Sequence, residues 1–224
     1  FRAAAAAALD LAEQQDALVT VGAVPDRPET GYGYVIPGEP LGAGHRIAHF
    51  FEKPSADAAQ ALIARGALWN TGLFAWTAKR FRAEVAAHTP ELADAMPHFD
   101  AGRVEAAFRA AKPVSIDVGL FERTQRGAVI GASFQWDDIG SWAALRRVRA
   151  ADAAGNVTSG DAHAVASSGC VVWSDDGQTV VYGMTDTVVV HARGMILVTT
   201  ADRAPELKKL LDQLPARLTG ERGA

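Results

Sequence analysis

Cysteine, basic runs and long apolar runs are scarce in this chain of 224 residues. The single cysteine, Cys170, excludes an internal disulfide and suits a reducing compartment, so we expect a cytoplasmic protein. Its neighbours Val171 and Val172 favour its interpretation as a small buried hydrophobic side chain. The formal net charge is −4 and the sequence has no stripe of Lys or Arg, so neither nucleic acid nor a membrane surface is an expected partner. No apolar run reaches the length of a membrane-spanning helix.

The sequence also lacks a first methionine and the charged-then-apolar pattern of a secretory signal peptide. It starts at Phe1, and the alanine-rich stretch at residues 2–15 already has the composition of a helix. We therefore expect that the chain begins inside a domain and that further sequence precedes it.

Apolar runs of strand length alternate with helix signals through the first two thirds of the chain. Strands are predicted at residues 17–24, 31–36, 45–51, 73–76 and 128–133, with a turn at 37–44. Helices are predicted at residues 2–15, 56–65, 78–87, 102–111 and 115–123, after Thr89, and from Trp142 with Ser141 as its cap. This alternation predicts an α/β fold with a mixed sheet.

The character of the sequence changes near residue 151. Short valine-rich runs predict strands at residues 162–165, 170–173, 179–182, 187–191 and 195–198, with turns between them that include residues 175–177. A last helix is predicted at residues 204–214. We therefore divide the chain into an α/β part, residues 1–150, and a β-rich domain, residues 151–224. Because so small a module cannot bury all of its apolar surface, we expect it to pack on the α/β part and to contribute to a homodimer.

Two adjacent acids, Asp137 and Asp138, lie between two tryptophans in the stretch Phe134 to Trp142. They follow a predicted strand and precede a predicted helix, which is a common place for a site in an open α/β sheet. Adjacent carboxylates repel each other, and a divalent cation would relieve that repulsion. The alternative is that both are simple turn residues.

Three further motifs place polar groups next to strand ends. Gly31 and Gly33 would let a backbone approach a ligand closely, or would simply open a glycine-rich strand. Glu52 and Lys53 offer a carboxylate for sugar hydroxyls and an ammonium for a phosphate, or form an exposed ion pair. Asn70 suits a hydroxyl-rich ligand because it can both donate and accept, or marks a turn.

Five motifs in this order resemble one family, the sugar-1-phosphate nucleotidyltransferases, and within it the mannose-1-phosphate guanylyltransferase (GDP-mannose pyrophosphorylase) branch. The motifs are RPETGYGYV, FFEKP, WNTGLF, SIDVGLFE and WDDIGSW. The resemblance runs over nearly the whole chain. It implies part of a Rossmann-like (GT-A-like) mixed sheet that carries the sugar-phosphate site in residues 1–150. Residues 151–224 would then be a small left-handed β-helix-like domain.

The resemblance also implies roles for particular residues. The backbone of Gly33 would contact the sugar, Glu52 would hold its hydroxyls, and Lys53 would neutralise its phosphate. Asp138 would bind Mg²⁺, with Asp137 as a variable neighbour. The remaining implied residues are Asn70 and Thr71, which would line the sugar pocket, and Asp117, for which a structural role is favoured.

The implied reaction transfers a nucleotidyl group from GTP to mannose-1-phosphate and yields GDP-mannose and pyrophosphate. The chain departs from the family pattern in two respects: it contains no glycine-rich loop with Arg and Lys that would hold the GTP phosphates, and no second metal-binding aspartate of the family pattern. We therefore expect that these 224 residues alone are inactive. Two other functions remain open, namely a glucose-1-phosphate enzyme with the same chemistry and a non-catalytic scaffold subunit of the same fold.

Overall fold

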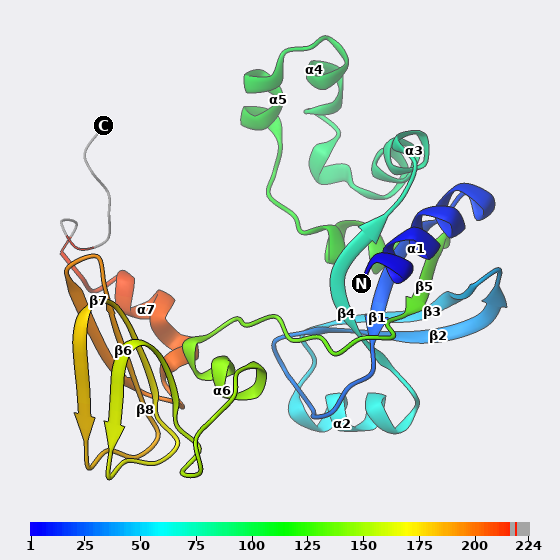
Figure 1. Ribbon diagram of the computed structural model, residues 1–224. Coiled ribbons are helices and arrows are strands. Elements are labelled where there is room, and N and C mark those ends of the chain that lie inside the picture. Colours follow the sequence, from blue (N-terminus) through cyan, green and yellow to red (C-terminus); the bar gives the residue numbers. More distant parts are fainter. Residues whose placement is uncertain (216–217, 219–224) are drawn as a thin grey trace. The chain divides into compact units, whose positions relative to one another are not determined.

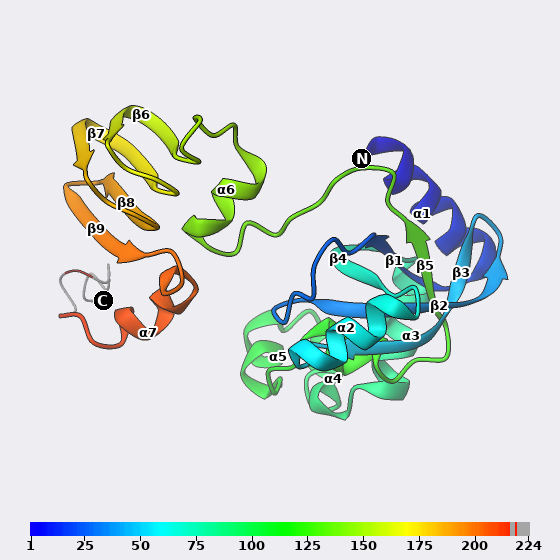
Figure 2. The ribbon, with the colours of Figure 1, turned by 90° about the horizontal axis from the view of Figure 1, so that it is seen from below.

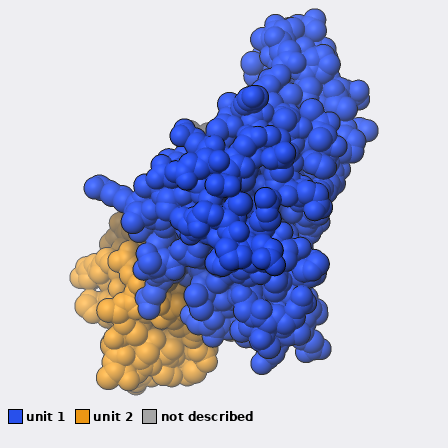
Figure 3. Space-filling view, turned by 90° about the vertical axis from the view of Figure 1, so that its right-hand side faces the viewer, with its two compact units in different colours: residues 1–136 blue, residues 137–224 orange. Residues whose placement is uncertain are grey.

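The computed structural model describes residues 1–215 and Leu218. The chain forms two compact units, Phe1–Trp136 and Asp137–Ala224, which Figure 3 shows in two colours. Each unit has a sheet and a core of its own, and each is described by itself.

The first unit alternates helices and strands, as the sequence predicts (Figure 1). Its elements are α1 (Arg2–Gln15), β1 (Leu18–Ala23), β2 (Gly33–Leu41), β3 (Gly44–Glu52), α2 (Ala56–Ala64), β4 (Leu68–Ala75), α3 (Ala78–His88), η1 (Pro90–Leu92), α4 (Met96–Asp100), α5 (Val104–Ala110), η2 (Asp117–Phe121) and β5 (Gly127–Gly131). The turn predicted at residues 37–44 is wrong, because β2 continues to Leu41 and only two residues separate it from β3. The helix predicted at residues 115–123 is a single π-helical turn, η2.

The sheet of this unit is mixed, and the α/β class is confirmed. Its strand order is β1-β4-β2-β3-β5, and β5 pairs in parallel with β1, so the ring of pairings closes. The other pairings are antiparallel, and two of them are only two residues long: Tyr34 and Val35 of β2 pair with β4, and His45 and Arg46 of β3 pair with β5. These short pairings let the long hairpin of β2 and β3 cross the end of the β1–β4–β5 group.

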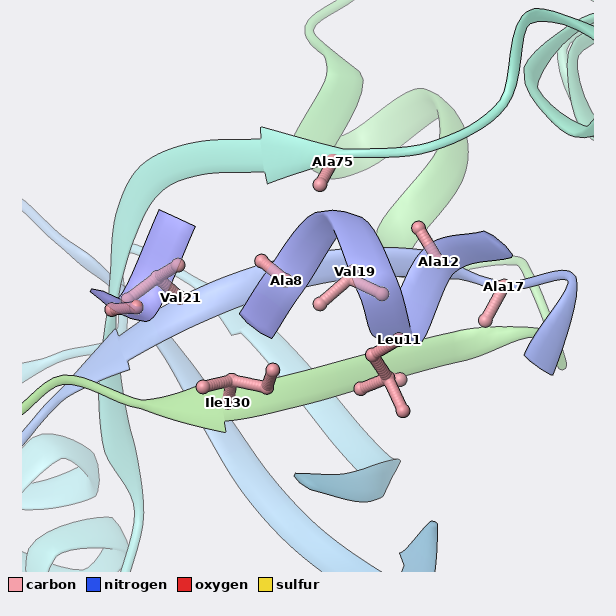
Figure 4. Packing of buried hydrophobic residues seen from close by; sticks show 10 residues of the cluster. Ala8, Leu11, Ala12, Ala17, Val19, Val21, Ala75 and Ile130 are labelled. Atoms are coloured by element: carbon pink, nitrogen blue, oxygen red, sulfur yellow. The ribbon is translucent and has the colours of Figure 1, made fainter. Parts of the chain in front are cut away.

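Three apolar clusters hold helices against the sheet of the first unit. Helix α1 lays Ala8, Leu11 and Ala12 over Val19 of β1 and Ile130 of β5 (Figure 4). Alanine on the inner face lets the helix approach the strands closely, and four of its residues are buried. Helix α2 packs on the side of the sheet opposite α1 (Figures 1 and 2), through Ala59 and Leu62. The third cluster joins α3 and η2 to β1, β2, β3 and β5.

The second unit begins with η3 (Trp142–Ala144) and α6 (Leu145–Val148), and continues with β6 (Val157–Val165), β7 (Val171–Tyr182), β8 (Thr187–Ala192), β9 (Met195–Thr200), η4 (Ala204–Glu206) and α7 (Leu207–Leu211). Four strands form the sheet of this unit. The turn predicted at residues 175–177 is wrong, because these residues lie within β7. The helix predicted at residues 204–214 is shorter, and its first turn is a 3₁₀ turn. Figure 2 shows the four strands side by side.

The strands of this unit pair in the order β6-β7-β8-β9. The pairs β6–β7 and β7–β8 are parallel although only short loops connect them, and β8–β9 is antiparallel. Strand β6 pairs with β7 in two stretches, Val157 to Gly160 and Ala162 to Val165, with a corner between them. An isolated parallel bridge joins Ser168, in the connection from β6 to β7, to Thr185, in the connection from β7 to β8. Cys170 is buried in the core of this unit, as predicted. Within residues 1–215 and Leu218, no helix is long and apolar enough to cross a membrane.

Candidate functional site

Glu52 and Gly33 face each other across the β2–β3 ladder in the first unit. Gly33 opens β2, Glu52 closes β3, and the register pairs the two residues directly. A Cβ atom on Gly33 would lie 2.9 Å from Glu52 Oε2 and 3.3 Å from the Cβ of Asn70. A side chain at position 33 would therefore fill the space that these two polar side chains border, which explains the glycine in physical terms.

Lys53 follows β3 directly in an unusual backbone conformation. Its φ angle is +48°, in the left-handed region that side-chain-bearing residues rarely occupy. Its backbone N–H still donates to the carbonyl of Tyr32 over 3.2 Å, so the ladder extends one residue past the strand. The turn places Lys53 Nζ 2.8 Å from Glu52 Oε1. The hydrogen bond and negative charge of Glu52, with a further contribution from Asp117, raise the pKa of Lys53 and hold it charged.

Asn70 lies on β4 at a β-bulge. The register with β1 pairs Thr20 with Phe74 and then Gly22 with Asn70, so three residues of β4 face one residue of β1. Gly72 accommodates the bulge with a φ angle of +72°. The Thr71 hydroxyl donates to the carbonyl of Val21 over 2.7 Å inside the bulge. Bulges redirect neighbouring side chains, and this one turns Asn70 towards Asp117.

The side chain of Asn70 is held by three hydrogen bonds. Its Oδ1 accepts from the Thr20 hydroxyl over 2.7 Å and from the Gly72 N–H over 3.3 Å. Its Nδ2 donates to Asp117 Oδ1 over 2.8 Å. Partial burial, and then the nearby charge of Glu52, raise the pKa of Asp117, while the bond from Asn70 opposes that shift. Glu52, Lys53, Asn70 and Asp117 therefore form one polar cluster.

The sequence singled out Gly33, Glu52, Lys53 and Asn70, and the structure brings these four together. Thr71 is adjacent, but its side chain is buried and bonded within the sheet. Thr20 and the part that Asp117 plays in the cluster were missed. The SIDVGLFE motif could have indicated that Asp117 belongs to the site. Thr20 is a threonine inside an apolar run, and nothing in the sequence indicates its role.

The motif that begins at Arg27 folds over the aromatic side of the same sheet. The guanidinium of Arg27 lies 4.8 Å from the ring centroid of Trp69 and its Nε lies 3.3 Å from Glu29 Oε2. The hydroxyl of Tyr34 donates to the carbonyl of Glu29 over 2.8 Å. These contacts fix the loop that leads into Gly33. The RPETGYGYV motif therefore holds the start of β2, where Gly33 lies, in place.

Asp137 and Asp138 belong to the second unit and differ sharply in their surroundings. Both carboxylate oxygens of Asp137 accept bonds from Arg147, and its side chain is only 6% exposed. Asp138 is exposed, and its Oδ1 accepts from the N–H of Gly140 over 3.0 Å. Ile139, which follows Asp138, has a φ angle of +49°, a strained conformation for a β-branched residue. Ser141 is the N-cap residue of the turn that starts at Trp142, as predicted, but its side chain makes no capping hydrogen bond.

The described part of the chain contains no group of three or more His, Cys, Asp or Glu side chains placed to hold a metal ion. Mg²⁺ does not require such a group, because it is often bound by one or two carboxylates together with substrate phosphates and water. The carboxylate of Asp138 is exposed to solvent and would supply such a single ligand; that of Asp137 accepts two hydrogen bonds from Arg147.

This fold and its donor groups define an α/β protein with a polar site at the strand ends of a mixed sheet. A model of the nucleotidyl transferase family matches residues 1–155, and the chain belongs to this family. The family predicted from the five motifs is thereby confirmed.

Relatives of known name support a narrower comparison. The chain is 36% identical over 232 residues to mannose-1-phosphate guanylyltransferase of Escherichia coli K12. This alignment covers 96% of this chain and 48% of that protein. The chain is 33% identical over 231 residues to alginate biosynthesis protein AlgA of Pseudomonas aeruginosa, covering 97% and 48%. The chain thus spans about half the length of the curated relatives it matches.

A solved structure is similar over nearly the whole chain. It is described as mannose-1-phosphate geranyltransferase from Thermus thermophilus, and it superposes with a TM-score of 0.85 at 36% identity. The match covers 95% of this chain and 64% of that one. A nucleotidyltransferase-like arrangement of the sheet is therefore shown.

Proposed function

We propose that the protein containing this chain transfers a guanylyl group from GTP to mannose-1-phosphate, giving GDP-mannose and pyrophosphate. The observation that carries the proposal is the cluster of Glu52, Lys53, Asn70 and Asp117 at one end of the sheet. It combines two carboxylates and an amide for hydroxyl groups with one ammonium for a phosphate. The names of the similar proteins favour mannose-1-phosphate over other sugar phosphates.

Each side chain of the cluster has a role that follows from its chemistry. Glu52 accepts hydrogen bonds from sugar hydroxyls, and Lys53 neutralises the sugar phosphate because its charge is secured by Glu52 and Asp117. Gly33 allows the sugar to approach the backbone, since a Cβ there would collide with Glu52. Asn70 contacts the sugar, and Thr71 shapes the wall beside it through its position in the bulge.

The chemical step needs no nucleophile from the protein. A phosphate oxygen of mannose-1-phosphate forms a bond to the α-phosphorus of GTP, while the bond from that phosphorus to the bridging oxygen breaks. The electron pair of the broken bond leaves with pyrophosphate. Glu52 orients the sugar through its hydroxyls, and Lys53 orients the attacking phosphate and reduces its charge repulsion with the triphosphate. When bound, Mg²⁺ supplies charge neutralisation for the phosphates, and Asp138 would hold it.

We also propose that the second unit is a short left-handed β-helix that contributes to a homodimer, and that the protein is cytoplasmic. The parallel pairs β6–β7 and β7–β8, with a corner within β6 and β7, favour a β-helix. Ile196 and Val198 on β9 and Leu211 on α7 are exposed apolar side chains that a second copy would cover. Sedimentation of the full-length protein and of a form cut after residue 150 tests this: the first should be dimeric and the second not.

An assay with alternative substrate pairs tests the proposed reaction. The full-length protein is mixed with Mg²⁺, GTP or another nucleoside triphosphate, and either mannose-1-phosphate or glucose-1-phosphate, and the release of pyrophosphate is measured. Preference for GTP and mannose-1-phosphate is expected. Preference for glucose-1-phosphate would point to the related sugar specificity, and no turnover with any pair would point to a scaffold subunit.

A further inference from the structure

The orientation of the Asn70 amide is fixed by its neighbours. A backbone N–H can only donate, so the atom that accepts from Gly72 must be the amide oxygen. The Thr20 hydroxyl donates to the same oxygen over 2.7 Å. Both lone pairs of Oδ1 are thereby occupied. The nitrogen, which carries two N–H groups, gives one of them to Asp117 and keeps one for a ligand.

Thr20 itself has no exposed surface that a ligand could contact. It lies on β1, its relative exposure is 0%, and its hydroxyl is bonded on one side to Asn70, with the carbonyl of Leu73 at 3.5 Å. A side chain so enclosed acts on a ligand only through another residue. Asn70 is 9% exposed and is the residue through which it would act.

Resting on the function proposed above, we infer that Asn70 offers the sugar phosphate a single N–H donor and no acceptor, and that Thr20 is the positioning residue that sets this polarity together with Asp117. The ligand atom opposite Asn70 is then an acceptor, a hydroxyl or phosphate oxygen. The ligand's own O–H donors are left to the carboxylates of Glu52 and Asp117, which can only accept when ionised.

The energetic reason lies in burial. Removing the Thr20 hydroxyl leaves the amide oxygen with a single weak donor at 3.3 Å in a nearly closed site. Gly72 and Asp117 still favour the same amide orientation, but the amide is held less firmly about its last torsion, which is soft. Its second N–H is then aimed less well at the ligand oxygen.

The first test compares Thr20→Val, which keeps the shape and removes the donor, with Thr20→Ser, which keeps the donor. In the full-length protein, Thr20→Val should raise KM for mannose-1-phosphate roughly tenfold and leave KM for GTP unchanged. Thr20→Ser should leave KM for mannose-1-phosphate near the wild-type value. A purely structural role predicts instead that both variants lower the melting temperature without any change in KM, and that result would overturn the inference.

A double-mutant cycle tests whether Thr20 acts through Asn70. In an Asn70→Ala background, Thr20→Val should have no further effect on KM for the sugar phosphate. Additive effects of the two substitutions would contradict the inference.

A second variant keeps the inference testable if Thr20→Val fails to fold. Asn70→Asp replaces the donor by a second acceptor and should raise KM at least as much as Asn70→Ala. Near-normal KM in Asn70→Asp would show that residue 70 accepts from the ligand. The proposed function is checked separately with the wild-type protein: if glucose-1-phosphate proves to be the substrate, the same cycle is run with it, and the polarity of Asn70 is still decided. If no sugar phosphate turns over, binding of mannose-1-phosphate by calorimetry supplies the dissociation constants that the variants must change.

Discussion

Arg147 donates to both carboxylate oxygens of Asp137, from Nε to Oδ2 over 2.6 Å and from Nη2 to Oδ1 over 2.9 Å. Asp137 Oδ1 also accepts from the N–H of Ile139 over 3.0 Å. This two-bond pair anchors the loop in which Ile139 holds a left-handed conformation and Asp138 is exposed. The two adjacent acids therefore have different tasks in the fold, which leads to the first prediction.

Asp138→Asn should reduce kcat/KM of the full-length protein by roughly a hundredfold or more, because one carboxylate ligand of Mg²⁺ is lost. Asp137→Asn should keep most of the turnover and instead lower stability by about 1 kcal/mol, because Arg147 loses one charged partner near the surface. Kinetics and thermal unfolding of both variants measure this. Equal, mild losses of turnover in the two variants would remove Asp138 from the metal site.

Lys53→Ala should raise KM for mannose-1-phosphate by about 10- to 100-fold and change KM for GTP little, because one charge-assisted contact to the sugar phosphate is lost. Lys79→Ala is the matched control, since Lys79 is exposed on α3 and bonded to no member of the site. Steady-state kinetics with each substrate varied in turn give the answer. An unchanged KM for the sugar phosphate would speak decisively against the role of Lys53.

The pair formed by Glu91 and Arg123 should make the stability of the first unit depend on pH. Hydrogen bonds from Arg123 lower the pKa of Glu91 from 4.5 to about 2. Because the folded pKa is depressed, the stabilisation is fully present above pH 4.5 and is lost as the pH falls towards 2. Glu91→Gln should therefore lower the melting temperature at pH 7, and the difference from the wild type should vanish near pH 2.

Glu105→Gln is the control for this pH dependence. Glu105 lies 3.6 Å from Arg109, but both side chains are more than four-fifths exposed, so solvent screens the pair. No difference in melting temperature from the wild type is expected at any pH. A gap for Glu91→Gln that stays constant from pH 7 to pH 2 would refute the assigned cause.

The 224 residues by themselves should not catalyse the transfer. A triphosphate with roughly four negative charges is normally held by backbone N–H groups of a glycine-rich loop together with Arg or Lys, and the sequence contains no such loop. The measurement is release of pyrophosphate from GTP and mannose-1-phosphate by residues 1–224 alone. Turnover equal to that of a longer protein would show that the nucleotide site lies within these residues.

Periodicity and helix signals predicted most elements of the first unit, because α1, β1, α2 and α3 each depend on their own apolar spacing and caps. The Ser55 and Thr77 side chains, for example, accept from the backbone N–H groups of Ala58 and Arg80. Two of the errors concern local turn signals that lie inside strands. Asn70, Thr71 and Gly72 carry local turn signals, but pairing with β1 makes them a bulge within β4. Residues 175–177 also carry a turn signal, and they lie inside β7 between its two paired stretches, where Gly177 has a φ angle of +80°.

Residues of the candidate site could be predicted only where they belong to short sequence motifs with recognisable functional groups. Glu52 and Lys53 are neighbours in sequence, so their pairing needs no knowledge of the fold. The bond from Asn70 to Asp117 joins β4 to η2, and no spacing rule connects those segments. Thr20 looks like any β-branched strand residue, and only the bulge shows that its hydroxyl meets Asn70. The long-range bonds could be found only from the fold.

The position of β1 in the sheet also governs how the protein is made. All six residues of β1 are buried, yet its two neighbours are β4 and β5, and Leu18 pairs with Gly127. A ribosome delivers the chain from its first residue onward, so β1 emerges long before either neighbour exists. The pairing of β1 with β5, which closes the ring of strands, must therefore wait until Ile130 has left the exit tunnel. The coils of β6, β7 and β8 pair with sequence neighbours and can fold as they emerge.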